Sequence, residues 1–286
     1  MPETLRIGST QITAVRDADF RFIPTTFIPN VPPEGWRAYL GAVDPTEMGE
    51  SRVLTFVIRS QGKTILVDTG VGQWGLWRFG DGHLLESLAA IGIAPEDVDY
   101  VVPTHLHLDH VGWNTRPLPD GTIVPTFTNA RYLFQKLDWD YFTAPEFLNG
   151  ERVEPSQMMK NAVIPLEGTG LMDHIDHERV ITDDVTLLHT PGHTPGSVTL
   201  LVQSGSEAAL LIGDAAHHPA QLTETDWSPT ADIDPSLSAR SRKGVVEQAQ
   251  RLNAWVAGAH FREPGPAFGR IVPIDGRMIW QGAPLG

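Results

Sequence analysis

Two stretches of the chain repeat one pattern of apolar and polar positions. Residues 55–68 contain two apolar runs separated by a polar turn at Gly62, and the second run ends at Asp68. Residues 197–214 follow the same plan with a slightly longer turn and end at Asp214. Apolar and β-branched runs on either side of a glycine turn predict β-hairpins. The repeat therefore predicts two similar halves, each with a hairpin that ends at an aspartate.

Other segments complete the two halves. We expect helical segments near residues 83–91 and 238–255, and the apolar pair Val101-Val102 predicts a buried strand. Two sheets packed face to face with helices outside would accommodate both halves. The chain has 286 residues, of which 41% are hydrophobic, so it can bury a substantial core, and no linker divides it. We therefore expect residues 1–286 to form a single α+β domain.

Residues 104–110 follow the predicted strand directly and combine three imidazoles with a carboxylate, at His105, His107, Asp109 and His110. Side chains two apart in an extended backbone point the same way, so the first three can face one pocket. A turn at Asp109 would bring His110 to a second position nearby, which suggests two metal sites. Neutral imidazole and carboxylate suit zinc, iron, manganese or cobalt. A coincidental cluster of surface histidines is the alternative interpretation.

Three further candidates lie downstream. His193 lies in a loop with Pro and Gly on both sides, which holds an imidazole at a strand end. Asp214 ends an apolar run, and His260 ends a run of small and apolar residues. Each alone could be a buried histidine or an aspartate that caps the next turn. Together with residues 105–110, they predict the remaining ligands of a pair of metal ions.

With these residues in this order, the chain resembles the metallo-β-lactamase superfamily of binuclear metallohydrolases. The resemblance also covers the segment Leu66-Val67-Asp68-Thr69-Gly70 and spans nearly the whole chain. It implies a four-layer αββα sandwich with the ligands along one edge. It further implies one metal ion bound by His105, His107 and His193, a second bound by Asp109, His110 and His260, and Asp214 as the bridge.

Within the superfamily, the chain is similar to the lactonase-like branch with quorum-quenching acyl-homoserine lactonases and organophosphate hydrolases. Shared features include the continuation of the histidine motif through Trp113. The acyl-homoserine lactonases usually place a tyrosine three residues after the bridging aspartate, where this chain has His217. An imidazole there could donate a hydrogen bond to a developing oxyanion or act as a general acid, or it could only orient a ligand. We predict a site role for His217, leave His218 open, and expect Asp68 to brace the ligand loop.

Two metal ions about 3.5–4 Å apart can share a water molecule and lower its pKa toward neutrality. We therefore predict a binuclear hydrolase in which a hydroxide that bridges two divalent ions, zinc first among them, opens a lactone or cleaves a hydrophobic ester. Asp109 and His217 are the predicted catalytic residues. A phosphotriesterase and a glyoxalase II-like thioesterase are alternatives, as are a mononuclear iron oxygenase and a non-catalytic metal-stabilised binding protein. No Gly-x-Ser-x-Gly elbow supports a covalent serine route.

Composition narrows the range of partners and locations that we expect for the protein. The formal charge of −14 and only 21 Lys and Arg argue against nucleic-acid binding. There is no cysteine, hence no thiolate ligand or disulfide. The N-terminal residues lack a basic region followed by an apolar run, and no stretch approaches the ~20 apolar residues of a membrane span. We expect a cytoplasmic protein, with a homodimer possible.

The substrate pocket is expected to be apolar, because aromatic residues recur in segments that would form loops over the site. The Pro-rich residues 23–33 could form a lid or a dimer arm. Four other histidines, at positions 83, 174, 177 and 189, are expected on the surface or in loops. The candidate aromatic residues are Trp36, Trp74, Trp77, Phe79, Trp113, Trp139, Tyr141, Phe142 and Trp227.

Overall fold

The computed structural model describes residues 3–40, 43–76, 79–176, 178–261 and 265–283. Within these ranges, each half of the chain forms one mixed sheet of seven strands. The first sheet has the order β1 (Glu3–Ile7), β2 (Thr10–Phe22), β3 (Gly49–Ser60), β4 (Lys63–Val67), β5 (Tyr100–Val102), β8 (Arg131–Gln135) and β9 (Met172–Ile175). The second has the order β10 (Arg179–Thr182), β11 (Val185–His189), β12 (Val198–Ser204), β13 (Glu207–Leu211), β14 (Trp255–Ala257), β15 (Gly269–Ile274) and β16 (Arg277–Gly282). A separate small hairpin pairs β6 (Thr115–Pro117) with β7 (Ile123–Pro125).

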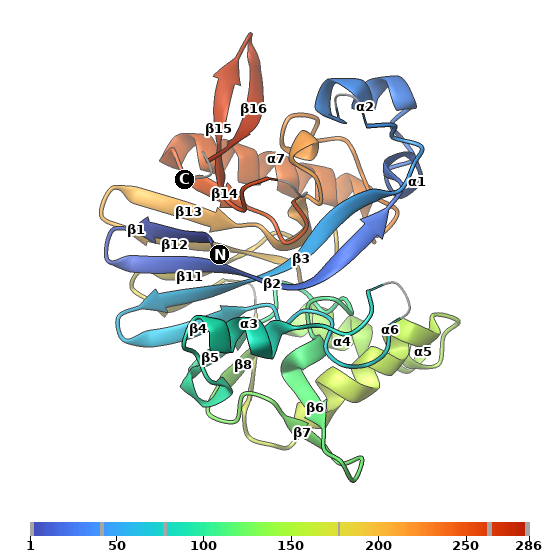
Figure 1. Cartoon of the computed structure of the whole chain (residues 1–286), viewed down its shortest axis with the longest axis vertical. Helices are drawn as coiled ribbons and strands as arrows, with labels where there is room; N and C mark the ends of the chain where they lie inside the picture. Colours follow the sequence, from blue (N-terminus) through green and yellow to red (C-terminus); the bar gives the residue numbers. More distant parts are fainter. Residues whose placement is uncertain (1–2, 41–42, 77–78, 177, 262–264, 284–286) are drawn as a thin grey trace.

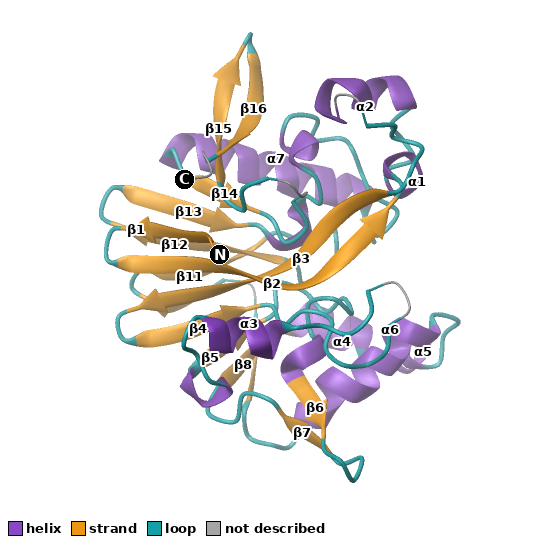
Figure 2. Cartoon of the chain, viewed as in Figure 1, coloured by secondary structure: helices purple, strands orange, loops and turns teal. Residues whose placement is uncertain are grey.

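Helices cover the outer face of each sheet (Figures 1 and 2). The first sheet is covered by α3 (Leu84–Ala90), α4 (Lys136–Phe142), α5 (Pro145–Leu148) and α6 (Val153–Met158), and the second by α7 (Pro235–Leu252). Two further helices, α1 (Pro24–Phe27) and α2 (Pro33–Leu40), follow β2. Across the described ranges, no helix is both long and apolar enough to span a lipid bilayer. The predicted αββα sandwich is confirmed.

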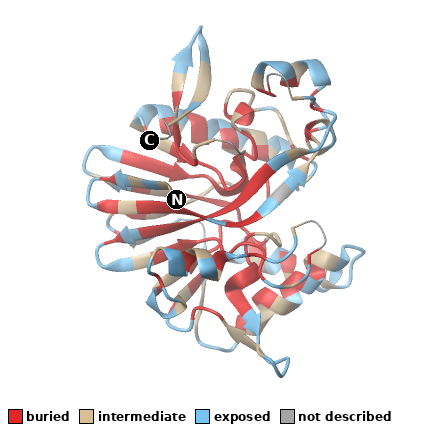
Figure 3. Ribbon diagram, viewed as in Figure 1, coloured by how far each residue is buried: buried red, intermediate tan, exposed pale blue. Residues whose placement is uncertain are grey.

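Alternation along the strands explains the layers, because successive side chains of a strand face opposite sides of its sheet. In β13, Ala209 and Leu211 pack into the core between the two sheets, whereas Leu210 packs toward α7. In β4, Ile65 and Val67 face the same central core, and Leu66 faces the helices of the first half. Central strands are therefore apolar on both faces, and the buried residues form a continuous band in Figure 3.

The predicted repeat appears in the topology. Strand β3 pairs antiparallel with β4, which pairs parallel with β5, and β12, β13 and β14 repeat this arrangement. Both predicted hairpins are confirmed, and α3 and α7 connect the parallel strands in their respective halves. A parallel pair ends at one edge of a sheet, so the residues that follow β4 and β5 lie together, as do those that follow β13 and β14.

The predicted helix at 238–255 has different limits. It begins at Pro235, because the Asp234 side chain accepts a hydrogen bond from the Leu237 backbone N–H and caps the helix. It ends at Leu252, because Asn253 adopts a left-handed conformation with φ of 46°. Residues 255–257 consequently form β14 and carry the chain toward His260.

The Pro-rich arm packs against its own chain. Ile28, Val31, Trp36 and Leu40 form a small buried cluster, and the Trp36 ring lies 4.8 Å from the ring of Trp227. The arm therefore folds back onto residues of the second half of the chain.

Candidate metal centre

All seven predicted ligands come together at one end of the sandwich, where four strands end. Strand β5 leads into the loop that carries the first four, β11 leads to His193, β13 to Asp214, and β14 to His260. Two sets have their ligand atoms within 4.8 Å of one another; they are His105, His107, His193 and Asp214, and Asp109, His110 and His260. Every position therefore comes from the carboxyl end of a strand, and each sheet supplies part of the site.

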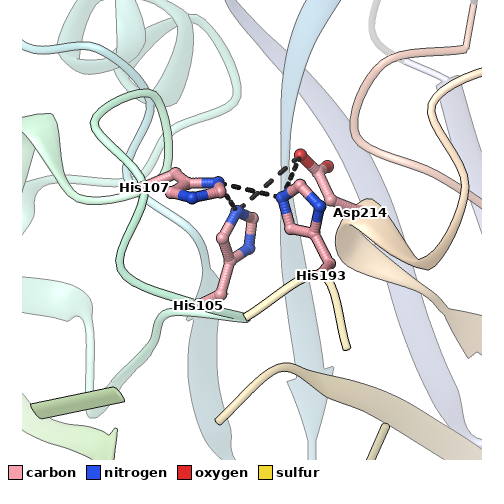
Figure 4. Close-up of side chains that lie close together, drawn as sticks. All are labelled: His105, His107, His193 and Asp214. Carbon is pink, nitrogen blue, oxygen red and sulfur yellow. Dashed lines mark hydrogen bonds and ion pairs between the residues drawn. The ribbon is translucent and has the colours of Figure 1, made fainter. Parts of the chain in front are cut away.

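Three imidazole nitrogens of the first set form a compact group (Figure 4). His105 Nε2 lies 3.0 Å from His107 Nδ1, which in turn lies 2.9 Å from His193 Nε2. Edges of roughly 3.4 Å are expected between nitrogens that surround a tetrahedral zinc ion at about 2.1 Å. The group is slightly tighter than that and has the right nitrogen donors.

The second set is adjacent. His110 Nε2 lies 3.3 Å from His260 Nε2, and Asp109 Oδ2 lies 3.4 Å from His260 Nε2. The Asp109 side chain is 14% exposed, whereas both histidines are buried. Two imidazoles and a carboxylate thus face one point, and the carboxylate is on the solvent side.

Asp214 lies between the two sets. Its Oδ2 is 3.7 Å from His105 Nε2 and 3.5 Å from His193 Nε2 on one side. The same oxygen is 3.4 Å from His110 Nε2, and Oδ1 is 3.3 Å from His260 Nε2. One carboxylate is therefore within reach of both positions.

The outer nitrogens of the histidines have fixed partners. His193 Nδ1 donates to Asp232 Oδ1 at 2.9 Å, and His260 Nδ1 donates to the carbonyl of Arg52 at 2.8 Å. His110 Nδ1 donates to Asp68 Oδ2 at 2.9 Å. Since each proton is on Nδ1, the inner Nε2 atoms present lone pairs. Such outer partners hold ligand rings in the orientation that a metal requires.

This donor set fits a divalent cation. His110 Nε2 and His260 Nε2 face each other at 3.3 Å; two neutral rings would oppose their lone pairs there, so a proton or a cation must lie between them. In the first set, His107 Nδ1 can donate to only one of its two imidazole neighbours, so a lone pair again faces a lone pair. A bound cation removes both repulsions. Nitrogen and oxygen donors without thiolate suit zinc and also iron, manganese or cobalt.

Burial and neighbouring charges shift the pKa values of the histidines in different directions. Burial lowers the pKa of His105 well below its usual value, and nearby His110 and His107 lower it further. Burial acts in the same direction on the pKa of His110, but the carboxylates of Asp214 and Asp68 outweigh it and raise that pKa well above the usual value. Burial raises the pKa of Asp214, yet His260 and the other imidazoles hold it well below the usual range. The centre therefore combines an ionised Asp214 carboxylate with a neutral His105 and with a His110 that retains its proton until a cation replaces it.

Asp68 has the bracing arrangement that its place in the repeat suggested. It follows β4 as Asp214 follows β13, but its carboxylate accepts hydrogen bonds from the Thr104 backbone N–H, the Thr104 hydroxyl and His110 Nδ1. Thr104 Oγ1 lies 3.1 Å from His105 Nδ1. Asp68 thus contacts the site from behind, through one imidazole and the residue that precedes the histidine cluster.

Asp138 was not predicted from sequence. This buried side chain accepts hydrogen bonds from the Leu106 N–H at 3.1 Å and from the Thr194 hydroxyl at 2.9 Å, as well as from the Gly196 N–H at 2.5 Å. It joins the loop of His105 and His107 to the loop of His193. A lone acid near the start of a short helix has no motif, so only the fold identifies it.

His217 lies beside Asp214, whereas His218 points away from the candidate ligands. His217 is buried, its Nε2 lies 3.0 Å from Asp214 Oδ2, and its ring stacks on that of His260 at 5.6 Å. Its Nδ1 has no hydrogen-bond partner among the described residues. His218 instead accepts a hydrogen bond from the Ala220 N–H and packs edge-on against Trp36.

The aromatic prediction is met in part. Phe142 lies edge-on to His107 at 5.6 Å, and Phe27 of the arm lies edge-on to His217 at 5.0 Å. Trp113 belongs to the core and donates from Nε1 to Asp17. Tyr141 is partly exposed. Among the other predictions, His83 and His174 are exposed, and Trp77 and His177 lie outside the described residues.

Comparison with known proteins identifies the family. The sequence model described as the metallo-beta-lactamase superfamily matches residues 48–260, from the start of β3 to the last candidate ligand. The chain belongs to the metallo-beta-lactamase superfamily. The predicted family and the predicted enzyme class, a metal-dependent hydrolase, are thereby confirmed.

Individual members of the superfamily resemble the chain over most of its length. The N-acyl homoserine lactonase AiiA of Bacillus thuringiensis subsp. kurstaki is 26% identical over 227 residues, which cover 73% of this chain and 81% of that protein. The crystal structure of the hydrolase AbOPH has a TM-score of 0.83 at 22% identity, and AidC, a dizinc quorum-quenching lactonase, has one of 0.82 at 20% identity. Both alignments cover 100% of this chain and 98% of the other. At these identities the two structures support the fold alone.

Proposed function

We propose that this protein is a binuclear metal-dependent hydrolase that opens lactones or cleaves hydrophobic esters. The observation that carries the proposal is the convergence of two donor sets on the Asp214 carboxylate, with the inner imidazole nitrogens kept free by partners on their outer side. A single-metal oxygenase would not need the second set of Asp109, His110 and His260. A non-catalytic site would not need a partly accessible carboxylate at Asp109, or an imidazole at His217 whose Nδ1 lacks a hydrogen-bond partner among the described residues.

In this proposal, each metal ion has its own set of ligands and Asp214 serves both. Support comes from the distances of its two oxygens to the inner nitrogens of both sets. Zinc is the first choice because the donors are imidazole and carboxylate only. The similar fold of AidC, described as dizinc, is consistent with this choice. The first ion is assigned to His105, His107 and His193, and the second to Asp109, His110 and His260.

The chemistry follows from where charge develops. Two divalent cations held here would acidify a shared water molecule and polarise the carbonyl of an ester. We assign to Asp109, the more exposed carboxylate, the acceptance of the proton that the attacking water would lose. We assign to His217, which lies beside Asp214, the hydrogen bond to the carbonyl oxygen or to the leaving oxygen as negative charge develops there. The apolar rings of Phe27 and Phe142 lie beside His217 and His107.

Lactones are favoured as substrates because the sequence relatives are named N-acyl homoserine lactonases. The apolar ring edges beside His107 and His217 suit an uncharged carbonyl compound better than a sugar phosphate. Since His217 occupies the position where we expect a tyrosine in those lactonases, the proposal covers lactones and hydrophobic esters as a class.

Metal analysis and a hydrolysis screen test the proposal together. We expect about two transition-metal ions per chain and turnover of a lactone or an aryl ester, in a panel that also holds phosphotriesters, thioesters and β-lactams. His107→Ala and Asp214→Ala should abolish turnover and reduce the metal content, whereas the exposed His83→Ala should change neither. A folded wild-type protein that contains no metal and hydrolyses nothing would refute the proposal, and preferred turnover of a thioester or phosphotriester would replace the substrate class.

A further inference from the structure

Arg242 is a fully buried arginine on α7, directly behind the metal centre. Its Nε donates to the Ala215 carbonyl at 2.6 Å, and its Nη1 donates to the carbonyls of Thr225 and Trp227 at 2.6 and 2.7 Å. Its Nη2 donates to Ser238 Oγ at 3.1 Å and to an Asp232 oxygen at 3.4 Å. All five N–H groups of the guanidinium are therefore used, none of them by solvent.

Two of these partners lead directly to candidate ligands. Asp232 Oδ2 faces the guanidinium, while Asp232 Oδ1 accepts the Nδ1 proton of His193 at 2.9 Å. The adjacent backbone contributes as well, since the Ile233 N–H donates to the His193 carbonyl at 3.1 Å. The second partner, Ala215, directly follows Asp214 in the chain. One side chain thus contacts both the acid that orients His193 and the turn that presents Asp214.

The geometry requires an arginine. A planar guanidinium presents five donors in a fixed fork, so it can bond several carbonyls and a carboxylate at once. A lysine at this position would offer three donors from a single point and could satisfy only part of the set. The Arg242 and Asp232 side chains are both fully buried, so loss of either charge leaves the other without compensation.

We propose that Arg242 is a positioning residue of the metal centre. It holds Asp232 so that the His193 ring keeps Nε2 inward, and it holds the Ala215 carbonyl so that the Asp214 carboxylate stays between the two ligand sets. The inference rests on the proposed function only in requiring that the cluster bind metal. A merely structural role would lower the stability of the protein without changing the affinity of the folded protein for metal.

Zinc affinity, measured by competition with a chromophoric chelator, distinguishes these roles. Arg242→Lys should weaken zinc binding by about 10- to 100-fold, as substitutions of outer-shell partners commonly do. In the cobalt-loaded protein it should also alter the visible absorption bands, which report ligand geometry. Far-UV circular dichroism checks that the variant is folded. Arg240→Lys is the matched control, since Arg240 lies on the exposed face of the same helix, and should leave zinc affinity unchanged.

A second variant covers the case in which Arg242→Lys does not fold. Asp232→Asn keeps the volume and removes the charge that Arg242 contacts, and it should weaken zinc binding in the same range. Where both single variants fold, the double variant should lose less affinity than the product of the two single losses, because the residues act through one chain of contacts.

Folded variants with wild-type zinc affinity would overturn the inference. So would a double variant whose loss of zinc affinity equals the product of the two single losses. In either case, a wild type that binds zinc and is active leaves the proposed function intact. A wild type that binds no zinc would contradict both.

Discussion

A histidine of this centre owes its ligand geometry to the group on its outer nitrogen. His193 and His110 give their Nδ1 protons to the carboxylates of Asp232 and Asp68, and His260 gives its proton to a backbone carbonyl. These bonds fix both the tautomer and the plane of each ring. A substitution one contact away from a ligand should therefore act on metal binding, whereas a neighbour that contacts substrate should act on turnover alone.

We propose that His217 is of the second kind, although it also contacts Asp214. His217→Ala removes an imidazole that contacts the Asp214 carboxylate but leaves all seven candidate ligands in place. We expect kcat to fall about 10²- to 10⁴-fold, the usual contribution of a positioned proton donor, with metal content near that of the wild type. Steady-state kinetics and metal analysis measure both quantities. His218→Ala is the control because His218 packs on Trp36; a large loss of metal in the His217 variant would instead make His217 a ligand.

Asp138 should make stability depend on pH. Burial raises its pKa from 3.8 to about 6, against the hydrogen bonds from Gly196 and Thr194 that lower it. A raised folded-state pKa means that this contribution to stability is fully present below pH ~4 and is lost as the pH rises through about 6. As the pH rises from 4 to 8, the free energy of unfolding of Asp138→Asn should therefore increase by on the order of 3 kcal/mol relative to that of the wild type. Chemical denaturation of both proteins in chelator measures this, and parallel pH profiles would contradict it.

At the scale of elements, sharp turns deliver the ligands. Strand β13 passes into Asp214 through Gly213, which has a φ of 48°. A Cβ at Gly213 would lie 2.8 Å from the Thr104 hydroxyl, which itself bonds Asp68 and contacts His105 Nδ1. The two strand ends that carry ligands from different sheets therefore approach each other at a point where only glycine fits.

Gly213→Ala and Gly205→Ala should separate this contact from the cost of the backbone conformation. Gly205 also has a positive φ, 64°, but a Cβ there would meet nothing within 4 Å. Gly205→Ala should cost about 1–2 kcal/mol of stability and leave activity unchanged. Gly213→Ala should cost more and also reduce metal content and turnover. Denaturation curves measure the stability of both variants, and metal analysis measures their metal content. Equal losses of stability and metal in the two variants would rule out the close contact as a constraint.

On the scale of the whole molecule, the site lies where the two halves meet. The first sheet supplies residues 105–110, and the second supplies His193, Asp214 and His260. Residues of both halves pack into one core between the two sheets. Bound metal ions would connect the two sheets at their edge, and their charge would offset part of the net −14 near the site.

Removal of metal should therefore loosen one edge of the molecule. A ligand that binds only the folded state, at 1,000 times its Kd, adds about 4 kcal/mol of stability. For a chain of this length, chelation should lower Tm by roughly 5–10 °C. Hydrogen exchange should quicken at residues 104–110, 190–197 and 213–217 while β4 and β12 stay protected. An unchanged Tm and exchange pattern in a protein shown to have lost its metal would contradict this role.

Much of the fold was readable from local pattern. Apolar alternation and glycine turns predicted both hairpins, because a strand that is buried on both faces has a distinctive composition. The limits of α7 were missed, since Asp234 and Asn253 determine them through capping geometry rather than through periodicity. The short helices α1 and α2 contain too few residues for a recognisable apolar periodicity. They could not be assigned without the packing of Trp36 on Trp227.

The sequence by itself determined the candidate ligands, because histidine and aspartate at strand ends are conspicuous and their spacing is typical of metal ligands. Only the tertiary structure decided how they act. The outer partners Asp232, Arg242 and Asp138 are far from the ligands in sequence and belong to no motif, and a hydrogen bond between distant residues leaves no local trace. For the same reason, only the structure could distinguish the surroundings of His217, which contacts Asp214, from those of His218, which packs on Trp36.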